Sequence, residues 1–248
     1  MLKREYFASF ALMLVVWIIA AAAVGNDILI PYPADVLKQV CALAVSSSAW
    51  RSILATSVRV LKGSFLSFAA ALIAAVCADA SRTADRLFAP LAVLANTVPN
   101  ISYIIIALIW LGSEGAVSMV TFMILFPLFF NSFRNRLVSV AGELGDVRSI
   151  YPETFLARTW KVTLPMLYQE MILSAKTGIS MGLKVGVMVE ILGSVRIGIG
   201  RQMSYAKANL DTTGLIAWTV IIILLSVMVN LAFDLLLKRM KEEREWKG

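Results

Sequence analysis

Residues 215–237 read LIAWTVIIILLSVMVNLAFDLLL, a long apolar run that indicates a membrane-spanning helix. An α-helix of about 20 predominantly apolar residues crosses the hydrocarbon core of a bilayer, and this stretch is long enough to do so. The same character extends through the chain, because 59% of its 248 residues are hydrophobic and the mean hydropathy is +0.80. A soluble domain is closer to about 45–50% apolar. The sequence therefore predicts an integral membrane protein.

Further apolar runs occur before residue 215, and we expect six membrane segments in all. Each is predicted to be a helix, since every backbone polar group must be satisfied within lipid and the segments are too long for barrel strands. The expected fold is all-α: one polytopic membrane domain over residues 1–248, with core helices over about 50–237. The six segments are approximately residues 6–24, 50–78, 87–111, 116–133, 166–193 and 215–237.

The distribution of Lys and Arg predicts the orientation. These residues concentrate at the two ends of the chain and in the connection 131–165, and they are sparser in the connections on the other side. Because cytoplasmic loops collect Lys and Arg, both termini are expected in the cytoplasm. The same bias accounts for the net charge of +7. Nucleic acid is not an expected partner, since no basic-aromatic module is visible.

Several kinds of chemistry are excluded by what the sequence lacks. There is no His, which removes His-based acid/base catalysis and the Ser-His-Asp and Cys-His nucleophile systems. Cys41 and Cys77 alone do not predict a disulfide framework or a metal site. No G-x-x-x-x-G-K-[ST] motif occurs, so the chain has no P-loop for ATP. We expect no catalytic residue, metal or cofactor on this chain.

The connection 131–165 contains a candidate docking helix. Pro152 can begin a helix, with Glu153 in its favourable first turn. Phe155 and Leu156 then lie on its apolar face. Such a helix suits a groove on a partner protein. From the residues alone, two other interpretations stay open: the helix could lie on lipid headgroups or pack on its own bundle.

Polar residues within the apolar segments are candidates for a translocation pathway. Asn96, Pro99 and Asn100 interrupt the third segment, and broken helices near the midplane often line transporter sites. Lys184 and Glu190 lie within the fifth segment, where an ionisable group costs at least about 2.5 kcal/mol and so faces protein or water. A cation such as Lys184 in a pathway would suit an anionic solute. For Glu190 a structural ion pair is an equal alternative.

Glycines and a further lysine in the fifth segment have simpler interpretations. Gly178, Gly182 and Gly186 recur every four residues and predict close helix packing, within the chain or at a dimer interface. Lys176, nearer the inner end, is expected to extend toward the headgroups.

The end of the connection reads Val162-Thr163-Leu164-Pro165, and here the chain resembles a known family. It is similar to the permease subunits of ABC importers of the nitrate/sulfonate/taurine type. In that family an inside loop carries a Glu-Ala-Ala motif, a Gly six residues after its Glu, and then V-x-L-P. Counting back from Pro165 places Asp146 at the Glu position and Pro152 at the Gly position. Other matching motifs are Pro31 and Pro33, Pro99 before Trp110-Leu111-Gly112, Asn131 after Pro127, and Glu190 before Gly198-Ile199-Gly200.

The resemblance implies a type I (MetI-like) importer permease in the inner, cytoplasmic membrane of a bacterium. It implies a homodimer, separate ABC ATPase subunits that bind ATP and Mg, and an extracytoplasmic substrate-binding protein. The solute would belong to the nitrate, sulfonate, taurine or vitamin-precursor classes. A secondary transporter or channel working without an ATPase is the alternative, and a membrane-embedded enzyme is a third hypothesis. The residues implied in coupling to the ATPase are Asp146, Pro152, Glu153, Phe155, Leu156, Leu164 and Pro165.

Overall fold

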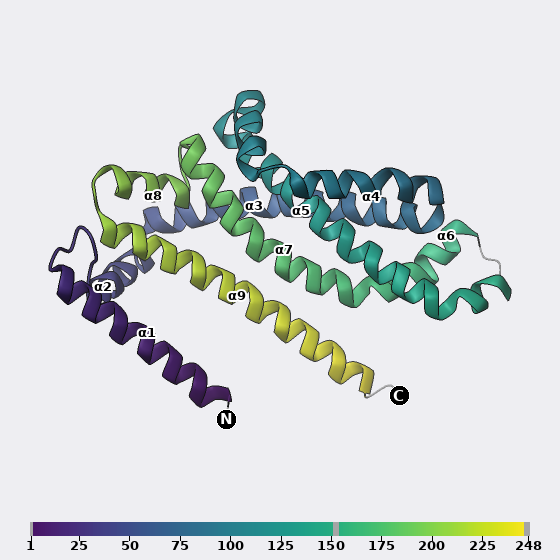
Figure 1. Cartoon of the computed structure of the whole chain (residues 1–248), viewed down its shortest axis with the longest axis horizontal. Helices are drawn as coiled ribbons and strands as arrows, with labels where there is room; N and C mark the ends of the chain where they lie inside the picture. The colour runs from purple at the N-terminus through teal and green to yellow at the C-terminus, as the bar shows by residue number, and fades with distance from the viewer. Residues whose placement is uncertain (1, 151–153, 246–248) are drawn as a thin grey trace.

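The computed structural model describes residues 2–150 and 154–245, and within these ranges it contains helices and no strand. In Figure 1, α3, α5 and α7 form the centre, α4 lies along α3, and α1 stands apart. The helices are α1 Leu2–Val24, α2 Pro33–Ala44, α3 Ser47–Ala80, α4 Arg82–Thr97, α5 Asn100–Ile150, α6 Phe155–Arg158, the π-helix η1 Thr159–Thr163, α7 Leu164–Gly193, α8 Ile199–Ala208 and α9 Thr212–Glu245.

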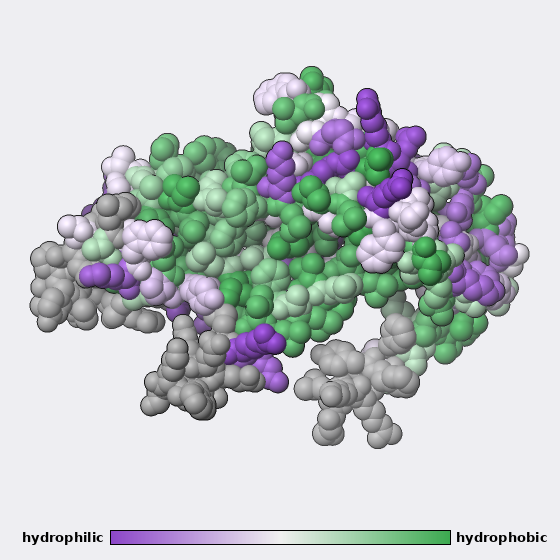
Figure 2. Space-filling view, turned by 180° about the vertical axis from the view of Figure 1, so that it is seen from behind, coloured by the Kyte–Doolittle hydropathy of each residue, from purple (hydrophilic) through white to green (hydrophobic). Residues whose placement is uncertain are grey.

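Four stretches within these helices are long and apolar enough to cross a membrane: Ser47–Ala80, Asn100–Ser139, Thr159–Gly193 and Thr212–Arg239. A shorter apolar stretch, Ala11–Val24, lies in α1 at the first expected segment. The all-α membrane fold is therefore confirmed. Seen from behind, much of the surface is apolar, and hydrophilic side chains gather in the upper right and along the right edge (Figure 2).

The third expected segment, 87–111, is not one helix. Arg82–Thr97 forms α4, the chain turns at Val98 and Pro99, and a new helix starts at Asn100. That helix breaks again at Gly112, whose φ of 65° and ψ of −178° are not helical. Proline disfavours a helical conformation for the residue before it, so the turn follows from Pro99 itself. The expected interruption at 96–100 is therefore present, and the further break at Gly112 was not expected.

The centre of the bundle depends on glycines that let helices approach closely. A Cβ added to Gly182 would lie 3.0 Å from the Ser64 hydroxyl of α3, and one added to Gly63 would lie 2.8 Å from the Thr121 Cβ of α5. Gly178 lies against the ring of Phe129. Close helix packing at the glycine repeat is confirmed, and these contacts are made within one chain.

The connection 131–165, in which a docking helix was expected, is mostly helical where the structure describes it. α5 continues without a turn to Ile150, and after three residues outside the described ranges the chain forms α6, η1 and α7. The helices therefore extend beyond the expected segment ends. The N-terminal end of α1 and the C-terminal end of α9 both lie along the lower side of the molecule (Figure 1).

Candidate functional site

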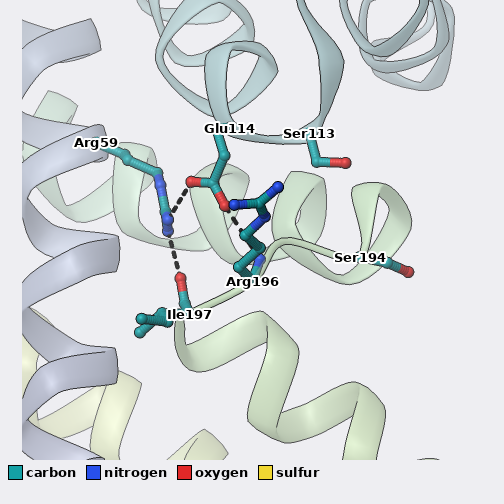
Figure 3. A pocket seen from close by; sticks show the side chains of 6 residues that line it. All are labelled: Arg59, Ser113, Glu114, Ser194, Arg196 and Ile197. Carbon is teal, nitrogen blue, oxygen red and sulfur yellow. Dashed lines mark hydrogen bonds and ion pairs between the residues drawn. The ribbon is translucent and has the colours of Figure 1, made fainter.

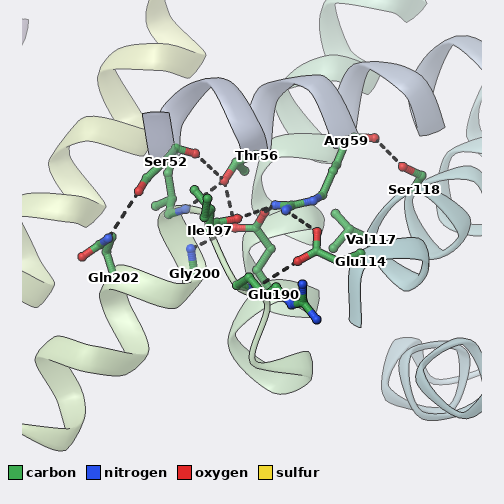
Figure 4. A network of polar contacts seen from close by, with 12 residues as sticks. Ser52, Thr56, Arg59, Glu114, Val117, Ser118, Glu190, Ile197, Gly200 and Gln202 are labelled. Carbon is green, nitrogen blue, oxygen red and sulfur yellow. Dashed lines mark hydrogen bonds and ion pairs between the residues drawn. The ribbon is translucent and has the colours of Figure 1, made fainter. Parts of the chain in front are cut away.

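Glu190 is fully buried in the last turn of α7, at 0% exposure. Its Oε2 accepts hydrogen bonds from the Thr56 hydroxyl and from the Gly200 N–H, each at 2.9 Å. Its Oε1 accepts one from Arg59 Nη1 at 2.7 Å (Figure 4). A buried charge is tolerated only when it is paired and hydrogen-bonded. Glu190 meets both conditions, so the structure places it in a network rather than on an open surface.

The segment after α7 folds back over Glu190 because two glycines permit it. α7 ends at Ser194, which adopts the left-handed conformation (φ 51°, ψ 52°) and reverses the chain. A Cβ at Gly198 would lie 2.6 Å from Glu190 Oε2, and one at Gly200 would lie 2.8 Å from both the Val187 carbonyl and a backbone N–H. These positions accept no side chain. The G-x-G motif is thus explained by the close approach of backbone to carboxylate.

Thr56 of α3 connects this segment to the bundle. Its hydroxyl oxygen accepts a hydrogen bond from the Ile199 N–H at 2.8 Å while it donates to Glu190. One turn earlier on α3, the Ser52 hydroxyl accepts a hydrogen bond from the Gln202 amide of α8 at 3.3 Å. The start of α8 is therefore fixed to α3 by side chains and main chain together.

Arg59, also on α3, extends the network to α5. Its Nη1 donates to the Ile197 carbonyl at 2.7 Å as well as to Glu190, and its Nη2 donates to Glu114 Oε2. The other oxygen of Glu114 accepts a hydrogen bond from the Arg196 N–H at 3.0 Å. We call Thr56, Arg59, Glu114, Glu190 and Gly200 the Glu190 network. It joins α3, α5, α7 and α8 at one end of the bundle.

A cavity of about 680 Å³ opens beside this network. Figure 3 shows Arg59 and Arg196 approaching Glu114 from α3 and from the segment before α8. We call this space the Glu114 cavity. Its lining residues are Arg59, Ser113, Glu114, Ser194, Arg196 and Ile197.

The break at Gly112 gives the cavity its α5 wall. A φ of 65° is readily adopted by glycine and costs a residue with a Cβ. The break turns the chain so that the next residue, Ser113, donates a hydrogen bond to the Gly193 carbonyl at the end of α7. Trp110-Leu111-Gly112 therefore has a backbone reason for its glycine, which the sequence alone did not reveal.

The opposite end of the bundle carries two further ion pairs. Arg158 of α6 donates to Asp79 of α3 at 2.6 Å. Arg134 of α5 forms a two-point contact with Asp85 of α4, in which Nη2 lies 2.8 Å from Oδ2. These pairs connect the short helix α6 and the start of α4 to the two long central helices.

The predicted coupling residues lie along the chain around α6. Asp146 lies in α5, and Leu164 and Pro165 are the first residues of α7. Phe155 and Leu156 are the first residues of α6. Pro152 and Glu153 lie outside the described residues. The contact of this region with an ATPase stays a prediction.

The predicted pathway residues do not gather at one place. Asn96 lies near the end of α4, exposed Pro99 lies between α4 and α5, and exposed Asn100 begins α5. Lys184 is exposed and lines a groove of about 410 Å³ between α7 and α9. Glu190 belongs to the buried network instead. Their role in translocation stays a prediction.

Sequence reasoning missed Thr56, Arg59, Glu114 and Arg196. A signal was present: Arg59 lies within an apolar segment and requires a partner of opposite charge at that depth. Lys176 pairs with Asp234 of α9 at 2.5 Å, a partner that the sequence did not predict. Within the described ranges, no three His, Cys, Asp or Glu side chains gather as a metal site would require.

Known proteins resemble the chain along most of its length. The taurine transport system permease protein TauC of Escherichia coli is 21% identical over 250 residues, covering 96% of this chain and 87% of TauC. The glycine betaine/carnitine transport permease protein GbuB of Listeria monocytogenes is 23% identical over 197 residues, covering 78% of this chain and 68% of GbuB. No family model matches the chain. Together with the helical membrane fold, these similarities relate the chain to the permease subunits of ABC importers.

Proposed function

We propose that this permease carries a small solute across the bacterial inner membrane and is driven by a separate ATPase that docks at α6. The observation that carries the docking proposal is the ion pair between Arg158 of α6 and Asp79 of α3. It means that a displacement of α6 acts directly on a central helix and not only on its neighbours in sequence. ATP and Mg would be bound by the ATPase subunits.

The local structure around α6 suits the transmission of movement. α6 continues into the π-helix Thr159–Thr163 and then into α7 with no non-helical residue between them. π-helical turns are energetically poorer than α-helical ones and are frequent at functional sites. At its far end α7 carries Glu190. A push on α6 would therefore reach the Glu190 network through α7 and through α3 at once.

The orientation and assembly are part of the proposal. The Lys and Arg bias favours a cytoplasmic location for both termini and for α6. The positions of the ends of α1 and α9 along one side of the molecule agree with this orientation (Figure 1). We propose a homodimer around a central route, supplied by an extracytoplasmic substrate-binding protein. The names of the two relatives favour a solute in the range of taurine, glycine betaine and carnitine.

The test is to purify the tagged chain gently from its native host, identify the proteins that accompany it, and measure ATP hydrolysis and solute uptake in liposomes. A stoichiometric ATPase is expected, and Phe155→Asp with Leu156→Asp is expected to abolish its association. The matched control is Leu37→Asp with Val45→Asp, which adds the same charge to exposed apolar residues of the α2 region. A chain that moves solute down a gradient with no ATPase present would instead be a secondary transporter or channel.

A further inference from the structure

Glu114 differs from the other members of the Glu190 network in its exposure. Its side chain is 49% exposed and faces the Glu114 cavity, whereas Glu190 is 0% exposed and Arg59 is 16% exposed. Glu114 also lies two residues after the break at Gly112, where the helix of α5 is interrupted. The Glu114 carboxylate can therefore rotate out of the network into the cavity without moving a buried charge, whereas the carboxylate of Glu190 cannot.

The two groups that donate hydrogen bonds to Glu114 are held in position by other contacts. Arg59 keeps its contacts with Glu190 Oε1 and the Ile197 carbonyl through Nη1, while Nη2 alone serves Glu114. The second donor is the backbone N–H of Arg196, fixed by the fold of the segment. If the Glu114 side chain rotated away, a guanidinium N–H and a backbone N–H would remain directed at the same space.

The charge around the vacated space would attract an anion. With Glu114 withdrawn, the cavity is lined by the cations Arg59 and Arg196, and Glu190 is the carboxylate that stays in contact with Arg59. Among the residues that the structure describes, the Arg196 guanidinium has no hydrogen-bond or ion-pair partner. Guanidinium and backbone N–H groups are the donors that recognise carboxylate and related oxyanions. The volume of about 680 Å³ leaves room for an organic body behind the acid group.

We infer that the Glu114 cavity is a binding site for the carboxylate or sulfonate group of a small organic solute, and that Glu114 is the internal ligand of this site. The incoming acid group takes the place of the Glu114 carboxylate on Arg59 Nη2 and the Arg196 N–H. The Glu114 side of the ion pair with Arg59 is half-exposed, which weakens the pair, so a solute present at millimolar concentration competes with it. As a statement about the transported solute, this inference rests on the proposed function, but binding itself requires no ATPase.

The test measures binding of radiolabelled methanesulfonate and acetate to the purified full-length protein at constant sodium chloride. Wild type is expected to bind weakly. Removing the internal ligand by Glu114→Ala is expected to tighten binding about tenfold, and Glu114→Gln to tighten it less. If Glu114→Ala does not fold, Glu114→Gln, which keeps the shape, carries the test. Glu170→Ala is the matched control, because the partner of Glu170 is the Ser174 hydroxyl of the same helix, and it should bind as wild type does.

Competition identifies what the site recognises. Unlabelled acetate should displace methanesulfonate, whereas dimethyl sulfone, its neutral counterpart of similar shape, should not. Arg196→Gln in the Glu114→Ala background should weaken binding several-fold while leaving the backbone N–H in place. Equal binding by wild type and both Glu114 variants would overturn the inference. It would also be overturned if dimethyl sulfone displaced the labelled methanesulfonate, or if phosphatidylglycerol displaced it and acetate did not. If an ATPase co-purifies but the protein binds neither anion, the site is refuted and the proposed function stands. If the protein binds the anions but no ATPase co-purifies, the site stands and the proposed function is refuted.

Discussion

The two ends of the helical core hold their charges in different ways. At one end, Glu190 is surrounded by side-chain and backbone donors and is fully buried. At the other, Asp85 and Arg134 pair only through their side chains, which remain 33% and 31% exposed. The first arrangement specifies one backbone path, because glycines and a loop are built around the carboxylate. The second holds helices together without fixing them, which suits the end where movement is proposed to enter.

The largest expected effect comes from removing the carboxylate at the rigid end. Glu190→Ala leaves Arg59 without its buried partner and the Gly200 N–H without an acceptor, so the free energy of unfolding should fall by about 3–5 kcal/mol. Denaturation of the purified protein with increasing detergent or temperature measures this. The control is Glu170→Ala, in which the free energy of unfolding should fall by much less. A loss below about 1 kcal/mol would mean that the two ends do not differ as described.

The next largest effect tests the backbone approach. In Gly200→Ala the new methyl group would meet main-chain atoms of Val187 and Ile191 at 2.8 Å, and main chain cannot move aside easily. We expect destabilisation of about 3 kcal/mol, as for overpacking in a core. In the control Gly115→Ala the nearest atoms belong to the side chain of Leu111, at 3.0 Å and beyond. Equal unfolding midpoints for the two variants would contradict the packing argument.

A smaller effect is expected where a single hydroxyl is removed. Thr56→Val keeps the shape but leaves the Ile199 N–H and one oxygen of Glu190 each short of a partner. The cost should be about 2 kcal/mol, the range for unsatisfied buried groups. Thr177→Val is the matched control, since Thr177 is exposed and donates only to the Leu173 carbonyl of its own helix. If both variants unfold alike, Thr56 does not fix the α8 segment.

The smallest effect is expected at the other end. Asp85→Asn removes the ion pair with Arg134, yet both side chains are about one-third exposed. Such pairs contribute about 0–1 kcal/mol, so the unfolding midpoint should hardly move. Restoring the pair in reverse, with Asp85→Arg and Arg134→Asp, should leave stability near that of wild type. A loss of several kcal/mol in Asp85→Asn would show that this end is as rigid as the one around Glu190.

The sequence predicted the parts of the fold that follow from local apolar runs. The segments at 166–193 and 215–237 correspond to α7 and α9 because long apolar runs have one solution in lipid. The glycine repeat on α7 predicted close packing for the same local reason. In the third segment the interruption around Pro99 was predicted, but a hydropathy run does not reveal the second break, at Gly112.

The candidate site was predicted only in part, because it is assembled from distant residues. Glu190 and the G-x-G motif were singled out from the sequence. Thr56, which donates to Glu190, and Glu114, which pairs with Arg59, lie 134 and 76 residues from Glu190 along the chain, and no local pattern joins them. The requirement that a buried charge be paired does predict that some cation must face Glu190, and Arg59 in the second segment was available to meet it.

The division of the third span also has a consequence for biosynthesis. α4 has 16 residues and includes Arg82, Asp85 and Arg86 at its start, while the piece after Pro99 reaches only to Gly112 before it breaks. Neither piece has the roughly 20 apolar residues by which a helix partitions into lipid by itself. As the chain leaves the ribosome, this region therefore depends on α3 and on the later part of α5 to enter the bilayer. Insertion of this permease is then a cooperative step in which neighbouring helices recruit a segment that the translocation machinery would not retain alone.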